Sequence, residues 1–157
     1  MLILQMVILL ICFPHPVEVR MKFLTDTEIQ LENIISKSHN DADGAMVLFT
    51  GIIRGRGKNL KKVKYIEYEA HPVLAEDSIE KLIEKSKEKW SINQAIVIHR
   101  TGRVEVNGIA VVIATFSSHR QAAYEANQFL INNIKQETAI WKKEVFDDGT
   151  IEWGKGG

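Results

Sequence analysis

Cysteine is nearly absent from this chain of 157 residues, which contains only Cys12. A single cysteine cannot form a disulfide within the chain, and it leaves no Cys-x-x-Cys pair for zinc or redox chemistry. The five histidines also lack the spacing of metal ligands. We therefore expect no metal and no cofactor of that kind, and a protein compatible with a reducing compartment such as the cytoplasm.

An excess of charge of one sign is missing as well. Lys plus Arg and Asp plus Glu both number 20, so the formal net charge is +0. A general nucleic-acid binder needs a strong excess of Lys and Arg, so this balance argues against that class. Any site for an anion must then be a local concentration of positive side chains.

A long hydrophobic run is also absent. Residues 2–13 are nearly all apolar, but Pro14 follows, and the run is too short to span a bilayer. The run lacks the basic start and the small-residue cleavage site of a signal peptide. We expect residues 1–20 to be a dispensable hydrophobic extension outside the fold, with no membrane role, and residues 21–157 to form a single domain that begins naturally at Met21. The alternative for residues 1–20 is a targeting role.

Short apolar runs separated by turn residues make up much of the remaining chain. Strands are predicted over residues 45–53, 63–70, 95–100 and 109–116. Asn107-Gly108 precedes the last run and predicts a hairpin with residues 104–106. Hairpins mixed with separate helices predict an α+β fold with a mainly antiparallel sheet and helices packed on it.

Three amphipathic segments predict helices. The first opens at Thr25, which has capping-box spacing to the glutamate three residues later, and the second opens at Pro72. The third opens at Ser118, again with capping-box spacing, to Gln121, and ends between residues 135 and 138.

His119 and Arg120 fall in the first turn of the third predicted helix, directly after a strand. A helix N-terminus offers free N–H groups and positive potential to a phosphate or carboxylate, and Arg adds a planar fork for bidentate contact. The alternative is that Arg120 pairs with a surface carboxylate and His119 is a turn residue. The sequence leaves both interpretations open.

Lys135 and Lys142 are the next candidates. Lys135 lies at a predicted helix end, where a cation is favoured by the helix dipole, so a purely structural role is also possible. Lys142 follows Trp141, and a lysine partly desolvated against an aromatic ring can act as an acid, base or nucleophile. The alternative for both lysines is a solvated surface.

A basic loop with interspersed glycines runs from Arg54 to Lys62, but it does not match the phosphate-binding Walker pattern. Most of its charges fit a solvated loop. Arg54 differs because it directly ends a buried strand and can be held rigidly. A nucleotide- or RNA-binding module that uses this loop is the alternative function.

Together these segments resemble the large, catalytic subunit of molybdopterin synthase, and their order and spacing hold from about residue 43 to residue 153. One departure is Ala139, where the family commonly has proline. The matching pieces are Phe49-Thr50-Gly51-Ile52-Ile53-Arg54, Tyr68-Glu69-Ala70, Ile98-His99-Arg100-Thr101-Gly102, Ser118-His119-Arg120, Lys135 and Ile140-Trp141-Lys142-Lys143-Glu144.

The resemblance implies a sulfur transferase that converts cyclic pyranopterin monophosphate (precursor Z) into molybdopterin by installing a dithiolene. Sulfur would arrive as a thiocarboxylate on the C-terminal glycine of a small ubiquitin-like carrier subunit. The large subunit would be a cytoplasmic homodimer within a heterotetramer and would need no cofactor. The cysteine content of the chain supports one part of this implied function. A chain with no cysteine after Cys12 cannot carry the sulfur as its own persulfide, so a partner must deliver it.

The resemblance also implies roles for individual residues in a catalytic domain spanning residues 21–157. His119 and Arg120 would serve the active site of the other protomer. A non-catalytic assembly protein, with solvated lysines, remains a further alternative. The implied set comprises Lys135 and Lys142 as catalytic residues, Arg54, His119 and Arg120 as substrate-binding residues, and Phe49 and Ile131 as residues that line the pocket.

Overall fold

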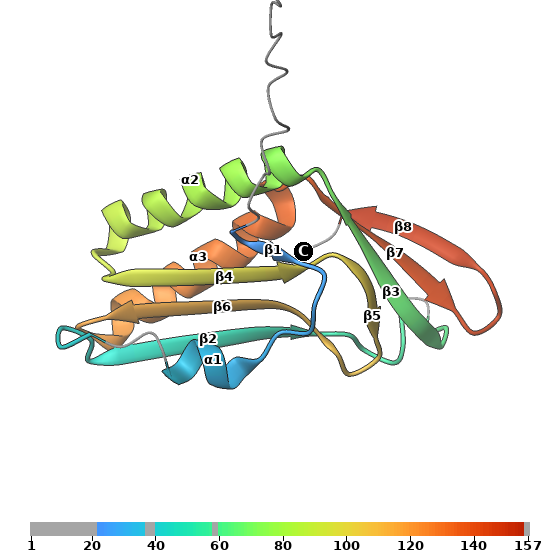
Figure 1. Cartoon of the computed structure of the whole chain (residues 1–157), viewed down its shortest axis with the longest axis horizontal. Helices are drawn as coiled ribbons and strands as arrows, with labels where there is room; N and C mark the ends of the chain where they lie inside the picture. Colours follow the sequence, from blue (N-terminus) through green and yellow to red (C-terminus); the bar gives the residue numbers. More distant parts are fainter. Residues whose placement is uncertain (1–21, 37–39, 58–59, 156–157) are drawn as a thin grey trace, which may run out of the picture.

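The computed structural model describes residues 22–36, 40–57 and 60–155, so the expected extension at residues 1–20 lies outside the described residues. Figure 1 shows two sheets, with the second placed at one end of the first. The first sheet has the order β1-β4-β6-β2, and only the β1–β4 pair is parallel. Its strands are β1 (Leu24–Thr25), β4 (Gln94–Arg100), β6 (Ile109–Ser117) and β2 (Ala45–Ile52).

The second sheet is antiparallel throughout and has the order β5-β3-β7-β8. Its strands are β5 (Gly102–Glu105), β3 (Val63–Ala70), β7 (Ile140–Phe146) and β8 (Ile151–Lys155). The helices are α1 (Leu31–Ser36), α2 (Pro72–Trp90) and α3 (Arg120–Glu137). The predicted α+β class is confirmed, although the strands divide between two sheets.

The main hydrophobic core lies between the first sheet, the long helices and the second sheet. Helices α2 and α3 cover one face of the first sheet (Figure 1). The opposite face carries a smaller cluster, in which Ile34 of α1 packs with Val112 and Phe116 of β6. Residues that are fully buried in the main core include Ile79 and Leu82 of α2, Leu130 and Ile134 of α3, Val97, Ile113, Ile140 and Phe146.

The turn at Asn107-Gly108 forms, but the predicted hairpin is wrong. β5 pairs with β3 in the second sheet, whereas β6 pairs with β2 and β4 in the first. The backbone of Ile53 occupies the place of a hairpin partner: its N–H donates to Gly108 O at 3.0 Å, and its carbonyl accepts from Asn107 N at 2.9 Å. The turn therefore carries the chain from one sheet to the other.

Both predicted capping boxes are wrong. Thr25 belongs to β1, where its carbonyl accepts from Thr101 N at 2.8 Å, and α1 begins only at Leu31. Ser118 donates its hydroxyl to Ala42 O at 3.0 Å instead of capping a helix, and α3 begins at Arg120. The Ser118 hydroxyl is thus taken by a tertiary hydrogen bond, whereas the Thr25 hydroxyl accepts from the backbone N–H of Thr27 at 3.2 Å in the turn after β1.

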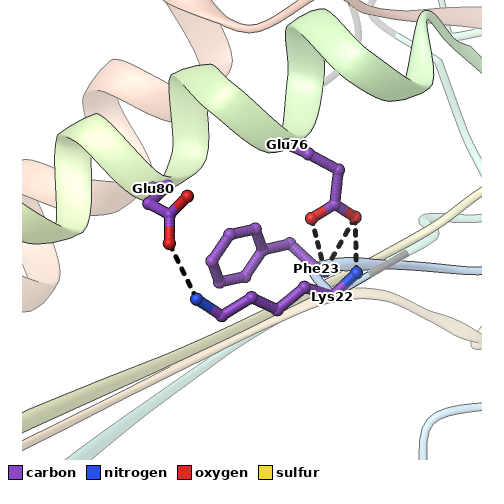
Figure 2. Close-up of polar contacts among 4 residues, drawn as sticks. All are labelled: Lys22, Phe23, Glu76 and Glu80. Atoms are coloured by element: carbon purple, nitrogen blue, oxygen red, sulfur yellow. Dashed lines mark hydrogen bonds and ion pairs between the residues drawn. The ribbon is translucent and has the colours of Figure 1, made fainter. Parts of the chain in front are cut away.

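Glu76 of α2 holds the start of the described chain to the helix. Its carboxylate accepts the backbone N–H groups of Lys22 at 2.9 Å, Phe23 at 2.8 Å and Leu24 at 3.0 Å. The Lys22 ammonium donates to Glu80 one turn further along, at 2.8 Å (Figure 2). These contacts hold the start of β1 to α2, while β1 itself pairs in parallel with β4. Within the described part of the chain, no helix combines the length and apolar character that a membrane crossing requires.

Candidate functional site

A cavity opens where the two sheets meet near the end of α3. Its wall combines the exit of β2, the start of β6, the inner face of β3 and β7, and the last turn of α3. Four of the residues that line it are cations and one is a carboxylate, so the cavity is a local concentration of positive charge in a chain with no net charge. These charged residues are Arg54, Arg56, Lys135, Lys142 and Glu144.

Lys142 and Glu144 share the inner face of β7 because side chains alternate along a strand. Lys142 Nζ lies 2.7 Å from Glu144 Oε1, and the two side chains are only 28% and 17% exposed. Trp141 and Lys143 lie on the opposite face, where Lys143 Nζ pairs with a Glu67 oxygen at 3.0 Å. Lys142 is thus partly buried as expected, but alternation places it on the other face of the strand from Trp141.

The stem of Lys142 has room because its neighbour on the edge strand β8 is a glycine. Gly154 pairs with Lys142 across the two strands, and a Cβ built on it would lie 3.4 Å from the Lys142 Cε atom. A larger side chain there would compete with the lysine for space. A shallow groove over β8, lined by Glu152, Trp153 and Gly154, meets the cavity at the Lys142–Glu144 pair.

Lys135 and Arg54 reach the same cavity from the other side. Lys135 lies in the last turn of α3, which ends at a Thr138 hydroxyl that donates to Ile134 O at 2.6 Å. Arg54 follows Ile53, which is 3% exposed and is held by the hydrogen bonds to Asn107 and Gly108 described above. The structure therefore brings together three of the predicted site residues, Arg54, Lys135 and Lys142.

His119 and Arg120 do not join them within one chain. Both are exposed at the start of α3, while Lys135 lies at its end. At 1.5 Å of rise per residue, Arg120 and Lys135 are about 22 Å apart along the helix. His119 and Arg120 instead line a separate hollow together with Gly44, Ser118, Gln121, Tyr124 and Glu125.

Phe49 and Ile131, expected to line the pocket, lie in the main core instead. Phe49 is partly buried on β2 opposite Ile113, and Ile131 is 9% exposed on α3. Ile131 belongs to the main buried cluster, Phe49 packs against it, and neither is among the residues that line the cavity. Their side chains support the fold around the site.

Sequence reasoning missed Glu144 and Tyr68 as parts of the site. The signal for Glu144 was available, because two-residue spacing puts it on the same face of β7 as Lys142. Tyr68 enters the wall because β3 pairs with β7 so that Tyr68 is opposite Lys142. Burial, and next the charge of Glu144, raise the pKa of Tyr68 to about 12.

His99 lies behind Tyr68. It is fully buried, and burial lowers its pKa to about 4 even though a hydrogen bond to the Arg100 carbonyl opposes the shift. The Nδ1 atom lies 2.8 Å from that carbonyl, so Nδ1 carries the proton, and Nε2 has no hydrogen-bond partner among the described residues. The ring meets Tyr68 edge to face, with centroids 5.0 Å apart.

The basic loop is partly neutralised by the turn after β7. Lys61 and Lys62 pair with Asp148 and Asp147 at 3.1 Å and 2.7 Å, and Arg56 donates to Leu60 O at 3.3 Å. Lys58 and Asn59 lie outside the described residues. These pairs disfavour the alternative of a nucleic-acid site built on this loop, because they satisfy charges that such a site would present to phosphates.

Comparison with known proteins shows which protein family this chain is similar to. A family model described as "MoaE protein" matches residues 24–137. A curated protein from Bacillus subtilis (strain 168), named "Molybdopterin synthase catalytic subunit", is 41% identical over 126 residues, which are 80% of this chain and 80% of the relative. A protein of the same name from Staphylococcus aureus (strain Mu50 / ATCC 700699) is 39% identical over 122 residues, 78% of this chain and 82% of the relative.

Solved structures also match the fold of this chain. "The X-ray Crystal Structure of Molybdopterin Synthase from Staphylococcus aureus" contains a chain that matches with a TM-score of 0.80 and 35% identity, covering 87% of this chain and 98% of that one. A chain of the "Protein-protein complex of subunit 1 and 2 of Molybdopterin-converting factor from Helicobacter pylori 26695" matches with a TM-score of 0.70 at 18% identity, covering 85% and 89%. The second likeness concerns the fold alone.

Proposed function

The chain belongs to the MoaE family, and on this premise we propose that it is the catalytic subunit of a molybdopterin synthase. It would transfer sulfur from a thiocarboxylated small subunit to cyclic pyranopterin monophosphate and so build the molybdopterin dithiolene. The observation that carries this proposal is the cavity in which Arg54, Lys135 and Lys142 converge from three separate elements. Both reactants are anions, and this cavity offers them four cations against one carboxylate.

Within the cavity, Lys142 is the residue best placed to orient the thiocarboxylate. Its ion pair with Glu144 uses one of the three ammonium donors and fixes the position of Nζ, while the other donors remain for a substrate. Lys135 faces the same space from the C-terminal turn of α3. Arg54, at the rigid exit of β2, suits the phosphate ester because its guanidinium can bind two oxygens at once.

A complete site would need two chains. His119 and Arg120 lie too far from Lys135 to act on the same substrate within one protomer. We infer that they serve the cavity of the partner in a homodimer, where the free N–H groups of the first turn of α3 and the Arg120 fork would add to the anion site. The small carrier subunit would then dock at each cavity, which gives a heterotetramer.

The reaction would take place in the cytoplasm, and residues 1–20 would be dispensable for it. The family match begins at residue 24, close to the residues that Glu76 holds to α2. A variant that begins at Met21 should therefore keep the turnover of the full chain. The outcome against this proposal would be a variant that folds but loses turnover.

The experiment that tests the function is a reconstituted conversion. This protein is combined with a thiocarboxylated small subunit and cyclic pyranopterin monophosphate, and molybdopterin is detected as its fluorescent oxidised derivative. Product should form with the wild type and be severely reduced in Lys135→Ala and Lys142→Ala. The matched control is Lys143→Ala, which removes a neighbouring lysine from the opposite face of the same strand.

Absence of product from a folded wild type, with a carrier that a related synthase accepts, would contradict the proposal. Equal product from wild type and both cavity variants would contradict the assignment of the site while leaving the activity in place. The two failures are therefore distinguishable.

A further inference from the structure

Tyr68 has no assigned role, yet it lies beside the lysine that the proposed function places at the reacting groups. In the antiparallel pair of β3 and β7, Tyr68 is directly opposite Lys142, and Ile66 is opposite Glu144. Directly opposite residues project to the same face, with Cβ atoms about 5 Å apart. Tyr68 is 7% exposed and forms part of the cavity wall.

The ring of Tyr68 is fixed from behind. His99, fully buried at the end of β4, meets it edge to face at an interplanar angle of 77°. The hydrogen bond from His99 Nδ1 to the Arg100 carbonyl sets the orientation of the imidazole in turn. A tyrosine ring packed in this way presents its hydroxyl from a defined position, which is what a site needs from a group that orients a reactant.

The hydroxyl is available as a donor. It makes no hydrogen bond to another described residue, and the nearby charge of Glu144 opposes its ionisation. Among the described residues that line the cavity, the other side-chain donors belong to Arg54, Arg56, Lys135 and Lys142 and are all cations. Tyr68 thus adds a neutral donor, which supplies direction without further charge.

We propose that the Tyr68 hydroxyl binds substrate in this cavity by donating a hydrogen bond to an anionic oxygen held beside Lys142. The inference rests on the synthase function proposed above and adds a binding residue to its site. Both reactants of that function carry such oxygens: the pterin has a phosphate ester, and the carrier ends in a thiocarboxylate. The experiment separates these two sources.

The test is Tyr68→Phe, which removes the hydroxyl and keeps the ring that packs on His99. Values of kcat and KM are measured for the pterin at saturating carrier and for the carrier at saturating pterin. Loss of a hydrogen bond to a charged group should lower kcat/KM by about 10- to 100-fold. The fall should appear as a raised KM for one reactant, and that reactant is the one that Tyr68 binds.

Tyr65→Phe is the matched control. Tyr65 lies on the same strand but on the opposite face, where its ring contacts the Arg103 guanidinium at 3.9 Å. Its kinetic constants should stay within about twofold of the wild type, since it does not line the cavity. The thermal unfolding midpoint of each variant is recorded first, and kinetics are measured well below it, so that a loss of stability cannot imitate a loss of binding.

Unchanged KM values for both reactants in Tyr68→Phe would overturn the inference, whatever happens to kcat. A wild type that forms no product would overturn the proposed function and this inference with it. Because the wild type is measured in the same assay, an error in the role assigned to Tyr68 can be distinguished from an error in the proposed function.

Discussion

Lys142 and Glu144 form an ion pair within one strand, two residues apart, with 2.7 Å between Nζ and Oε1. Both side chains are more than two-thirds buried at the mouth of the cavity. An ion pair in such a position is screened less by solvent than a surface pair, and either charge left alone there would be poorly solvated. Glu144 therefore determines where the ammonium of Lys142 lies.

The first prediction concerns Glu144. Glu144→Gln keeps the size of the side chain but removes the charge that holds Lys142, so turnover in the conversion assay should fall at least about tenfold through misplacement of the ammonium. Glu67→Gln is the control, because it removes the corresponding partner of Lys143 on the outer face of β7. Equal losses in the two variants would contradict a specific role for Glu144.

A second prediction follows from the length of α3. If His119 and Arg120 complete the cavity of the partner, a Lys135→Ala chain and an Arg120→Ala chain should each be inactive alone but complement one another in mixed dimers. In a two-fold symmetric dimer, random mixing leaves about a quarter of the sites intact, so about a quarter of wild-type turnover should return. The measurement is turnover after the two variants are unfolded and refolded together. No recovery would show that each site uses one chain only.

His99 leads to a prediction on pH and stability. Its pKa falls from the ordinary 6.5 to about 4 in the folded chain, so the unfolded state binds more protons between these values. Stability from this residue is fully present above pH 6.5, declines as the pH falls toward 4, and is lost below it, a change on the order of 3 kcal/mol.

The measurement for His99 is urea unfolding between pH 7 and pH 4. The variant His99→Asn keeps a donor near the Arg100 carbonyl but does not titrate in this range. Its stability should be lower at pH 7 and should change less with pH than that of the wild type. Parallel pH profiles for the two proteins would refute the assignment of this dependence to His99.

Glu76 provides a prediction on folding. Its carboxylate accepts three consecutive backbone N–H groups, of Lys22, Phe23 and Leu24, so Glu76→Ala leaves them without a partner and should cost about 1–3 kcal/mol. Glu80→Ala is the comparison, since its pair with Lys22 joins two largely exposed side chains and should contribute little. Chemical unfolding of both variants measures the difference. Equal stability of the two would contradict the importance of this anchor.

Much of the fold was predictable because the apolar side chains of a helix or strand recur at a regular spacing, which can be recognised within a short stretch of sequence. The strand at β3 has the predicted bounds, and Pro72 begins α2 as expected. Two of the errors share a physical cause, since a distant contact replaces the predicted local one. Ser118 bonds to Ala42, and Ile53 occupies the backbone groups beside Asn107.

The site was predictable only in part. Arg54 and Lys135 stood out by charge and by their place at the ends of elements, Lys142 stood out by its place beside Trp141, and the cavity brings all three together. Tyr68 could not be found from spacing, because its position depends on how β3 aligns with β7. That register is set by the packing of the whole second sheet, which no short motif contains.

The connection between α3 and β7 is very short, and its length fixes which side chains enter the cavity. Gain or loss of a single residue between Glu137 and Ile140 would turn β7 over, so that Trp141 and Lys143 would face inward in place of Lys142 and Glu144. A substitution in this connection leaves the alternation of side chains along β7 unchanged, whereas an insertion or deletion of one residue reverses it. Length variation compatible with activity must therefore fall elsewhere, as in the turn after Phe146, where the chain has already passed the cavity.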